Sequence, residues 1–152
     1  MKKFEFKLES LLNYRRHREL IARQDVSQAV MDLMACEARI QDLEQQRDHG
    51  VGVLEEKISQ GLNATLFNQY SDYLNGLSYL IQREKEQKQH YQKILAEKRE
   101  ILKKRSIDKK AMERLREKRK QEYTKSVLHQ EQKELDEISS LKTARELTNA
   151  MD

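Results

Sequence analysis

Residues Gly61 to Gln82 read GLNATLFNQYSDYLNGLSYLIQ and differ in composition from the rest of the chain. Asp72 is their only charged residue, although 37% of all residues in the chain are charged. They contain three of the six tyrosines and one of the three phenylalanines, and Gly50 and Gly52 come shortly before them. We therefore expect the chain to reverse just before this stretch, which then opens a second long helix. Its aromatic and leucine surface exceeds what one helix pair needs, so the surplus is a candidate partner-docking face.

The composition argues against a thick hydrophobic core. Of the 152 residues 37% are hydrophobic, and the mean hydropathy is −0.98. A compact domain is usually roughly half apolar and a quarter charged. A seam between helices needs only about two apolar positions in seven, and the absence of proline permits very long helices. We therefore favour an all-α coiled coil, with a disordered chain as the alternative for so polar a composition.

The net charge of +4 is unevenly distributed. Residues 1–60 carry ten basic and eleven acidic side chains, residues 83–120 carry sixteen and seven, and residues 121–152 carry four and seven. The basic run of residues 98–120 is the nearest approach to a nucleic-acid-binding pattern, because Lys and Arg on one helix neutralise phosphates. Acidic residues interleave with it and aromatic residues are missing, so charge pairing along the helix explains most of the run. We expect no nucleic-acid partner; nucleic-acid binding and an anionic membrane surface are the alternatives.

Nothing in the sequence indicates export or membrane insertion. Cys36 is the only cysteine, so a disulfide within the chain is excluded and a reducing compartment fits. The N-terminal MKKFEFKLES lacks the unbroken apolar core of a secretory signal. No run approaches the ~20 apolar residues of a membrane span. We expect a cytosolic protein that reaches a membrane only through a partner.

A heptad repeat predicts a first helix from about residue 4 to about residue 58. Apolar or small residues alternate at spacings of four and three, which is the pattern of a coiled-coil seam. One seam position holds Leu8, Ala22, Ala29, Cys36 and Leu43, and the other holds Leu12, Val26, Leu33, Ile40 and Leu54. The residues expected to interrupt this seam are Arg15, Glu19 and Arg47.

The turn is expected at residues 59–63. Gly50 and Gly52 each cost a helix roughly 1 kcal/mol relative to alanine, so the first helix is expected to fray or bend there. Gly61 is a good helix stop, and Asn63 is a plausible N-cap for the second helix. The second helix is expected from about residue 64 to about residue 147, with its weakest position at Gly76. Its expected seam residues are Tyr70, Leu74, Leu77, Ile81, Tyr91, Leu95, Leu102 and Met112.

A short loop between two long helices predicts an antiparallel hairpin. With Leu54 opposite Tyr70, the numbers of facing residues sum to about 124, which places Leu12 opposite Met112. The second helix then overhangs the first, and residues 119–152 project as a single helix or fray. We expect one coiled-coil domain of residues 1–152. Apolar residues exposed on such a tail suggest a partner.

Chemical machinery is missing from the sequence. It has no glycine-rich phosphate-binding loop, and its four histidines are scattered without the spacing of a metal site. A two-helix hairpin also encloses no pocket of the size that ligands need. We expect no cofactor, no metal and no enzymatic activity.

Three patterns together resemble a known family. The chain opens with Phe4-x-Phe6-x-Leu8-x-x-Leu11-Leu12-x-x-Arg15, and the second helix opens with Tyr70-x-x-Tyr73-Leu74-x-x-Leu77. The tail contains Glu122-Tyr123, followed by EQKELDE at residues 131–137. Each pattern is weak alone, but in this order, over essentially the whole chain, they resemble the FliJ family of flagellar type III export proteins.

The resemblance implies an antiparallel two-helix coiled coil similar to the central stalk of rotary ATPases. Members of the family associate with the hexameric flagellar export ATPase, in whose central pore they are placed, and contact the membrane export gate. Some also bind export chaperones. The implied role is a soluble component that supports flagellum assembly at the cytoplasmic face of the inner membrane. A general coiled-coil adaptor or export-chaperone-binding protein, with no effect on an ATPase, is the alternative.

Carried over by position, the resemblance also implies two contact sites. The gate-docking face is the start of the second helix, where Tyr73 and Leu77 keep the expected aromatic and aliphatic character and Leu80 and Glu84 depart from it, with Leu43 nearby. Leu77 could instead be a seam residue only. The implied export-ATPase contacts lie where the termini meet: Leu8, Leu11, Leu12, Arg15, Arg16, Tyr123, Gln132, Leu135 and Ile138. For Arg15 and Arg16 the alternative is a solvated helix face.

Overall fold

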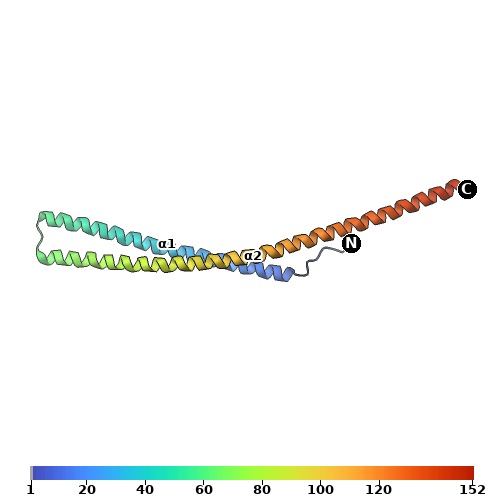
Figure 1. The fold of residues 1–152 in the computed structure, drawn as a ribbon. Helices are drawn as coiled ribbons and strands as arrows, with labels where there is room; N and C mark the ends of the chain where they lie inside the picture. Colours follow the sequence, from blue (N-terminus) through green and yellow to red (C-terminus); the bar gives the residue numbers. More distant parts are fainter. Residues whose placement is uncertain (1) are drawn as a thin grey trace. The chain divides into compact units, whose positions relative to one another are not determined.

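Two long helices make up the fold, in a computed structural model that describes residues 2–152 (Figure 1). Helix α1 (Glu9–Gln60) has 52 residues and helix α2 (Ala64–Met151) has 88. The described residues contain no strand. The all-α antiparallel coiled coil predicted from the sequence is confirmed. Neither helix has a stretch long and apolar enough to cross a membrane, over the residues described.

Helix α1 begins at Glu9, later than the expected start near Phe4. The first backbone bonds run from the Glu9 N–H to the Phe6 carbonyl (3.1 Å) and from the Leu12 N–H to the Leu8 carbonyl (2.9 Å). Side-chain contacts hold the preceding segment instead: the Phe4 ring lies 5.6 Å from the ring of Tyr123, measured between centroids. The expected start was therefore wrong, because a tertiary contact replaces the first helical turn. An acidic residue in the first turn also suits the helix dipole.

The chain turns at residues 61–63, inside the range of 59–63 expected from the sequence. Gly61 has a φ of +92°, a left-handed conformation that glycine adopts without steric cost, and its N–H donates to the Ile58 carbonyl (3.2 Å). The Asn63 side chain accepts a hydrogen bond from the Leu66 N–H (2.9 Å), which makes Asn63 the N-cap of α2. These local interactions end one helix and start the next within three residues.

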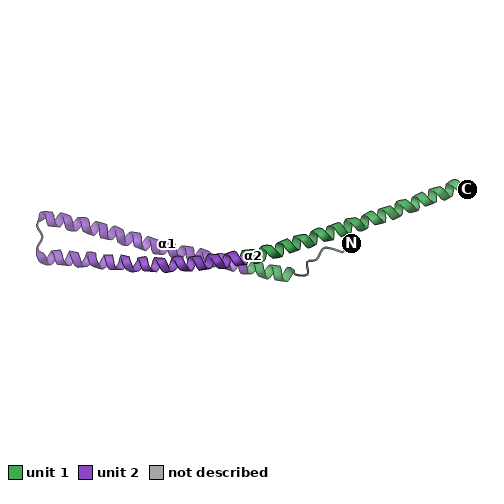
Figure 2. Cartoon of the chain, in the orientation of Figure 1, with its two compact units in different colours: residues 1–17, 106–152 green, residues 18–105 purple. Residues whose placement is uncertain are grey.

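The chain divides into two compact units (Figure 2). One consists of Met1–His17 with Ser106–Asp152, and the other of Arg18–Arg105. We call them the terminal unit and the turn unit. Each unit has its own packing between α1 and α2, and the single domain expected from the sequence stays a prediction.

In the turn unit, α1 and α2 lie side by side around a narrow seam (Figure 2). Pairs that face one another include Gly50 with Leu74 and Arg39 with Glu84, whose numbers sum to 124 and 123. The predicted antiparallel register is therefore confirmed. The buried apolar residues of this seam are Ala22, Ala29, Cys36 and Ile40 from α1, and Leu77, Ile81 and Leu95 from α2.

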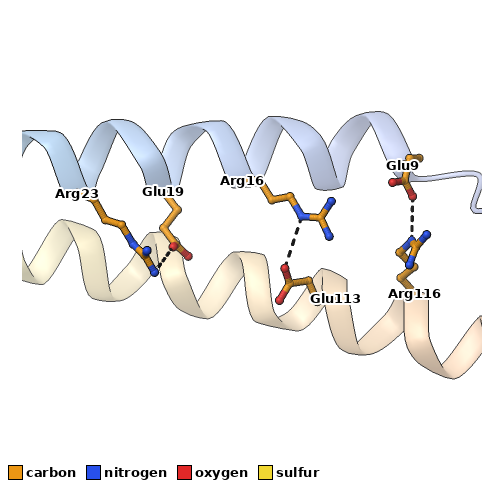
Figure 3. Close-up of polar contacts among 6 residues, drawn as sticks. All are labelled: Glu9, Arg16, Glu19, Arg23, Glu113 and Arg116. Atoms are coloured by element: carbon orange, nitrogen blue, oxygen red, sulfur yellow. Dashed lines mark hydrogen bonds and ion pairs between the residues drawn. The ribbon is translucent and has the colours of Figure 1, made fainter.

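Three positions of α1 in the turn unit, Glu19, Gly50 and Gly52, were expected to interrupt the seam or weaken the helix. Glu19, expected to interrupt the seam, is 4% exposed within it, and its Oε1 accepts a bond from Arg23 at 2.7 Å (Figure 3). Helix α1 also continues without interruption through Gly50 and Gly52, so the expected fraying was wrong. Gly50 is buried, and the Leu74 side chain of α2 lies close to it.

In the terminal unit, the start of α1 packs against α2 in the same register. Leu12 and Met112, expected to face one another, are both buried. Ion pairs join Glu9 to Arg116 (3.1 Å) and Arg16 to Glu113 (3.5 Å), as Figure 3 shows. These pairs connect the two helices, so part of the basic run is paired across the seam and not along its own helix.

The tail of α2 extends beyond this packing. In the described residues the pairing ends near Tyr123, whose hydroxyl donates to the Lys2 carbonyl. From residue 132 to residue 152 every position is exposed, yet the helix continues to Met151. The overhanging second helix predicted from the sequence is therefore present, as helix and not as a frayed end.

Candidate functional site

The start of α2 exposes more apolar surface than the seam uses, as predicted. Tyr73 is 53% exposed and Leu80 is 43% exposed, although both lie beside buried seam residues. Nearer the turn, Ile58, Leu62, Ala64 and Phe67 line a shallow hollow of about 310 Å³. The surplus lies on the outside of the turn unit, where a partner could reach it.

Four of the predicted gate-docking residues share one stripe of α2. Tyr73, Leu77, Leu80 and Glu84 are spaced by four, three and four residues, which brings them to the same side of a helix. Leu77 differs from the rest because it is buried at 6% exposure. The structure thus places Tyr73, Leu80 and Glu84 at the surface and Leu77 beneath them. We call Tyr73, Leu80 and Glu84 the hairpin face.

Glu84 is held by α1. Its Oε2 lies 3.3 Å from Nε of Arg39, and the Cys36 sulfur lies 3.4 Å from its backbone carbonyl and 3.7 Å from Oε2. The hydrogen bond to Glu84 raises the pKa of Arg39 above its ordinary value. Burial, and then the negative charge of Glu84, raise the pKa of the Cys36 thiol. Glu84 thus presents its carboxylate beside a guanidinium, so this end of the hairpin face carries both charges.

Leu43, the fifth predicted residue, is half-buried on α1. The register places it opposite Ile81, next to Leu80, so it borders the hairpin face. Sequence reasoning missed two residues on α1: Arg39, which pairs with Glu84, and Gly50, whose backbone lies against Tyr73 and Leu74. Arg39 could have been found from the register and the opposite charge. Gly50 was interpreted as a helix breaker.

The predicted ATPase contacts all fall in the terminal unit, but they do not form one continuous patch. Leu8 and Tyr123 line the same groove of about 820 Å³, between the N-terminal segment and α2. Leu12 is fully buried in the seam, whereas Leu11 is 40% exposed. The remaining lining of the groove is Lys2, Lys3, Phe4, Glu5, Phe6, Lys7, Leu115, Arg119, Glu122 and Ser126. Sequence reasoning missed these groove residues, because only the folded N-terminal segment brings them together.

The two arginines of this set are not simply solvated. Nη1 of Arg15 donates to the Asp108 carbonyl (3.0 Å), and Arg16 pairs with Glu113. Both side chains therefore help to hold α1 on α2. A partner that bound Arg15 or Arg16 would contact a residue that also joins the two helices.

The three tail residues of the set are exposed. Leu135 and Ile138 are 59% and 62% exposed, and Gln132 donates to Asp136 along its own helix (3.0 Å). No other part of the chain among residues 2–152 covers these leucine and isoleucine side chains. We call Leu8 and Tyr123, together with Gln132, Leu135 and Ile138, the terminal face.

No group of three or more His, Cys, Asp or Glu side chains is placed to hold a metal ion in the part of the chain that the structure describes. The exposed surfaces are apolar patches edged by charge, which suit protein contacts better than small ligands.

A comparison with protein families decides what kind of protein has this geometry. The family described as flagellar FliJ protein matches residues 4–148. The chain belongs to the FliJ family. It is therefore a component of flagellar protein export, and the resemblance found in the sequence is confirmed.

Among solved structures, this FliJ family member is similar to a protein of Chlamydia trachomatis described as a YscO homologue. The two share 20% identity over 91% of this chain and 94% of the other, with a TM-score of 0.52. At that identity the similarity shows a shared fold. No curated protein matches the chain.

Proposed function

We propose that this protein is a stalk-like subunit of flagellar export that binds the hexameric export ATPase and docks on the membrane export gate. It works in the cytoplasm, at the cytoplasmic face of the inner membrane, where the gate recruits it. It raises the rate of ATP hydrolysis by the export ATPase and does not hydrolyse ATP itself. Export chaperones are further partners in the proposal.

Exposed apolar residues outside the seam are the observation that carries the proposal. Fully burying an exposed Leu or Ile side chain contributes on the order of 1.5–3 kcal/mol, and covering the part that is still exposed contributes a share of this, which favours a partner. Tyr73 and Leu80 offer this surface on the turn unit, and Leu135 and Ile138 offer it on the terminal unit. Because the hairpin face and the terminal face lie in different units, we assign one partner to each: the gate to the hairpin face and the ATPase to the terminal face.

The charges support the same assignment. The hairpin face ends in the Arg39–Glu84 pair, which is partly exposed and can form hydrogen bonds with polar groups at the rim of an interface. Leu8 and Tyr123 of the terminal face line the groove, whose lining also carries Lys2, Lys3, Lys7 and Arg119 against Glu5 and Glu122. An excess of basic side chains favours an acidic patch on the ATPase.

The gate assignment is tested with Tyr73→Ala combined with Leu80→Ala. Leu77 is left intact, because it is buried and its truncation would destabilise the helix pair by about 2–5 kcal/mol. We expect the double variant to bind the cytoplasmic domain of the gate about tenfold more weakly or worse, as interface aromatics typically dominate affinity.

The matched control is Tyr79→Ala. Tyr79 is 66% exposed and lies six residues after Tyr73, which turns it about 120° away on the helix. It should bind the gate as the wild type does. Unchanged gate binding by a fully helical Tyr73→Ala/Leu80→Ala variant would remove the hairpin face from the proposal.

A further inference from the structure

Gly50 lies in the interior of α1 and is buried against α2. Glycine inside a helix costs about 1 kcal/mol relative to alanine, so the position needs a reason to lack a side chain. Its backbone is helical, and among the described residues only Gly61 has a positive φ. Conformational freedom therefore does not explain Gly50.

Close packing does explain it. A Cβ atom on Gly50 would lie 2.8 Å from Cδ2 of Leu74 and 3.5 Å from Cε1 of Tyr73. The first distance is shorter than carbon atoms tolerate, and the second is ordinary van der Waals contact. An alanine would thus displace the end of the Leu74 side chain, and its methyl group would touch the edge of the Tyr73 ring.

Gly52 provides the contrast within the same helical turn. A Cβ atom on Gly52 would meet no heavy atom within 4 Å. Gly50 and Gly52 cost the helix the same stability. Only Gly50 lies close to α2, beneath the hairpin face.

We infer that Gly50 is a positioning residue of the hairpin face: its missing side chain leaves the space in which the end of the Leu74 side chain and the adjacent edge of the Tyr73 ring lie against α1. Cε1 of the tyrosine ring lies 3.5 Å from the point that a Cβ on Gly50 would occupy, while 53% of the residue remains exposed. The ring is thereby held in one orientation before a partner arrives, which lowers the entropy lost on docking. The docking role of Gly50 rests on the proposed function, whereas its effect on the Tyr73 ring does not.

The test compares Gly50→Leu with Gly52→Leu. Both changes raise helix propensity by the same amount, so a difference between them reports contact with α2. In protein labelled with 3-fluorotyrosine, with the Tyr73 signal assigned by Tyr73→Phe, we expect Gly50→Leu to shift the Tyr73 fluorine resonance and Gly52→Leu to leave it in place. We also expect Gly50→Leu to weaken binding of the gate cytoplasmic domain about tenfold, and Gly52→Leu to have no effect.

A double-mutant cycle separates positioning from general destabilisation. In a Tyr73→Ala background, Gly50→Leu should cause no further loss of gate binding, because it acts through the ring. An equal loss in both backgrounds, or an unmoved Tyr73 resonance, would overturn the inference. Equal gate binding by Gly50→Leu and Gly52→Leu would do the same. Failure of the wild type to bind the gate domain would instead overturn the proposed function, and with it the docking role of Gly50.

Discussion

At the scale of single residues, Cys36 makes the turn unit sensitive to alkaline pH. Its thiol is fully buried, and burial together with Glu84 raises its pKa above the ordinary value of 9.0. A group with a raised pKa in the folded state stabilises the fold below the unfolded pKa, and this contribution is lost as pH rises through the folded value. We therefore expect the free energy of unfolding to fall above about pH 9, by at most about 1.4 kcal/mol per pH unit from this one group.

The measurement is urea unfolding between about pH 7 and pH 10.5 for the wild type and for Cys36→Ala. Lysines and tyrosines titrate in the same range, so the difference between the two proteins isolates the thiol. The alanine variant should lose less stability on the alkaline side. Parallel curves for the two proteins would contradict a raised thiol pKa.

At the scale of elements, replacing Gly61 of the turn and Gly76 of α2 by alanine should change the free energy of unfolding in opposite directions. Gly61 has a φ of +92°, so Gly61→Ala should lower the free energy of unfolding by about 1 kcal/mol or more. Gly76 is helical and has no heavy atom near its Cβ position, so Gly76→Ala should raise it by up to about 1 kcal/mol. Circular dichroism during urea unfolding measures both, and a shift of the same sign for the two variants would contradict this interpretation.

The same elements show what the sequence could predict. Gly61 and Asn63 act through bonds to neighbouring residues, so residue type and spacing were enough to place the turn. The heptad pattern likewise predicted Ala22 and Ile81 in the seam, because helical periodicity assigns faces without knowledge of the partner. The register then followed from the turn.

Features that depend on distant contacts were beyond such reasoning. The role of Gly50 follows from the short distance between a Cβ atom at this position and Cδ2 of Leu74. Helix propensity alone predicted instead that the helix would fray or bend there. The late start of α1 follows from Phe4 lying against Tyr123, far along the chain. For the candidate site, Tyr73 and Leu80 came from the family resemblance, and their exposure follows from their places beside the seam. The salt bridge of Glu84 with Arg39 joins two helices, and only the register together with the opposite charges could have indicated it.

At the scale of the whole molecule, we assign different partners to the two units. The terminal unit has the exposed tail of α2, and the turn unit has the hairpin face. In our proposal, the contribution of this protein to export lies in what its exposed surfaces bind. Our central claim is that the terminal face acts on the export ATPase.

The most direct test is the rate of ATP hydrolysis by the purified export ATPase, titrated with this protein. We predict a saturable rise, because the terminal face would bind the hexameric ring and favour its active form. A variant with Leu135→Ala and Ile138→Ala, whose side chains are exposed and so dispensable for folding, should need a higher concentration for the same rise. A flat rate with folded, helical wild-type protein would contradict the claim and leave gate docking or chaperone binding as the task of this FliJ family member.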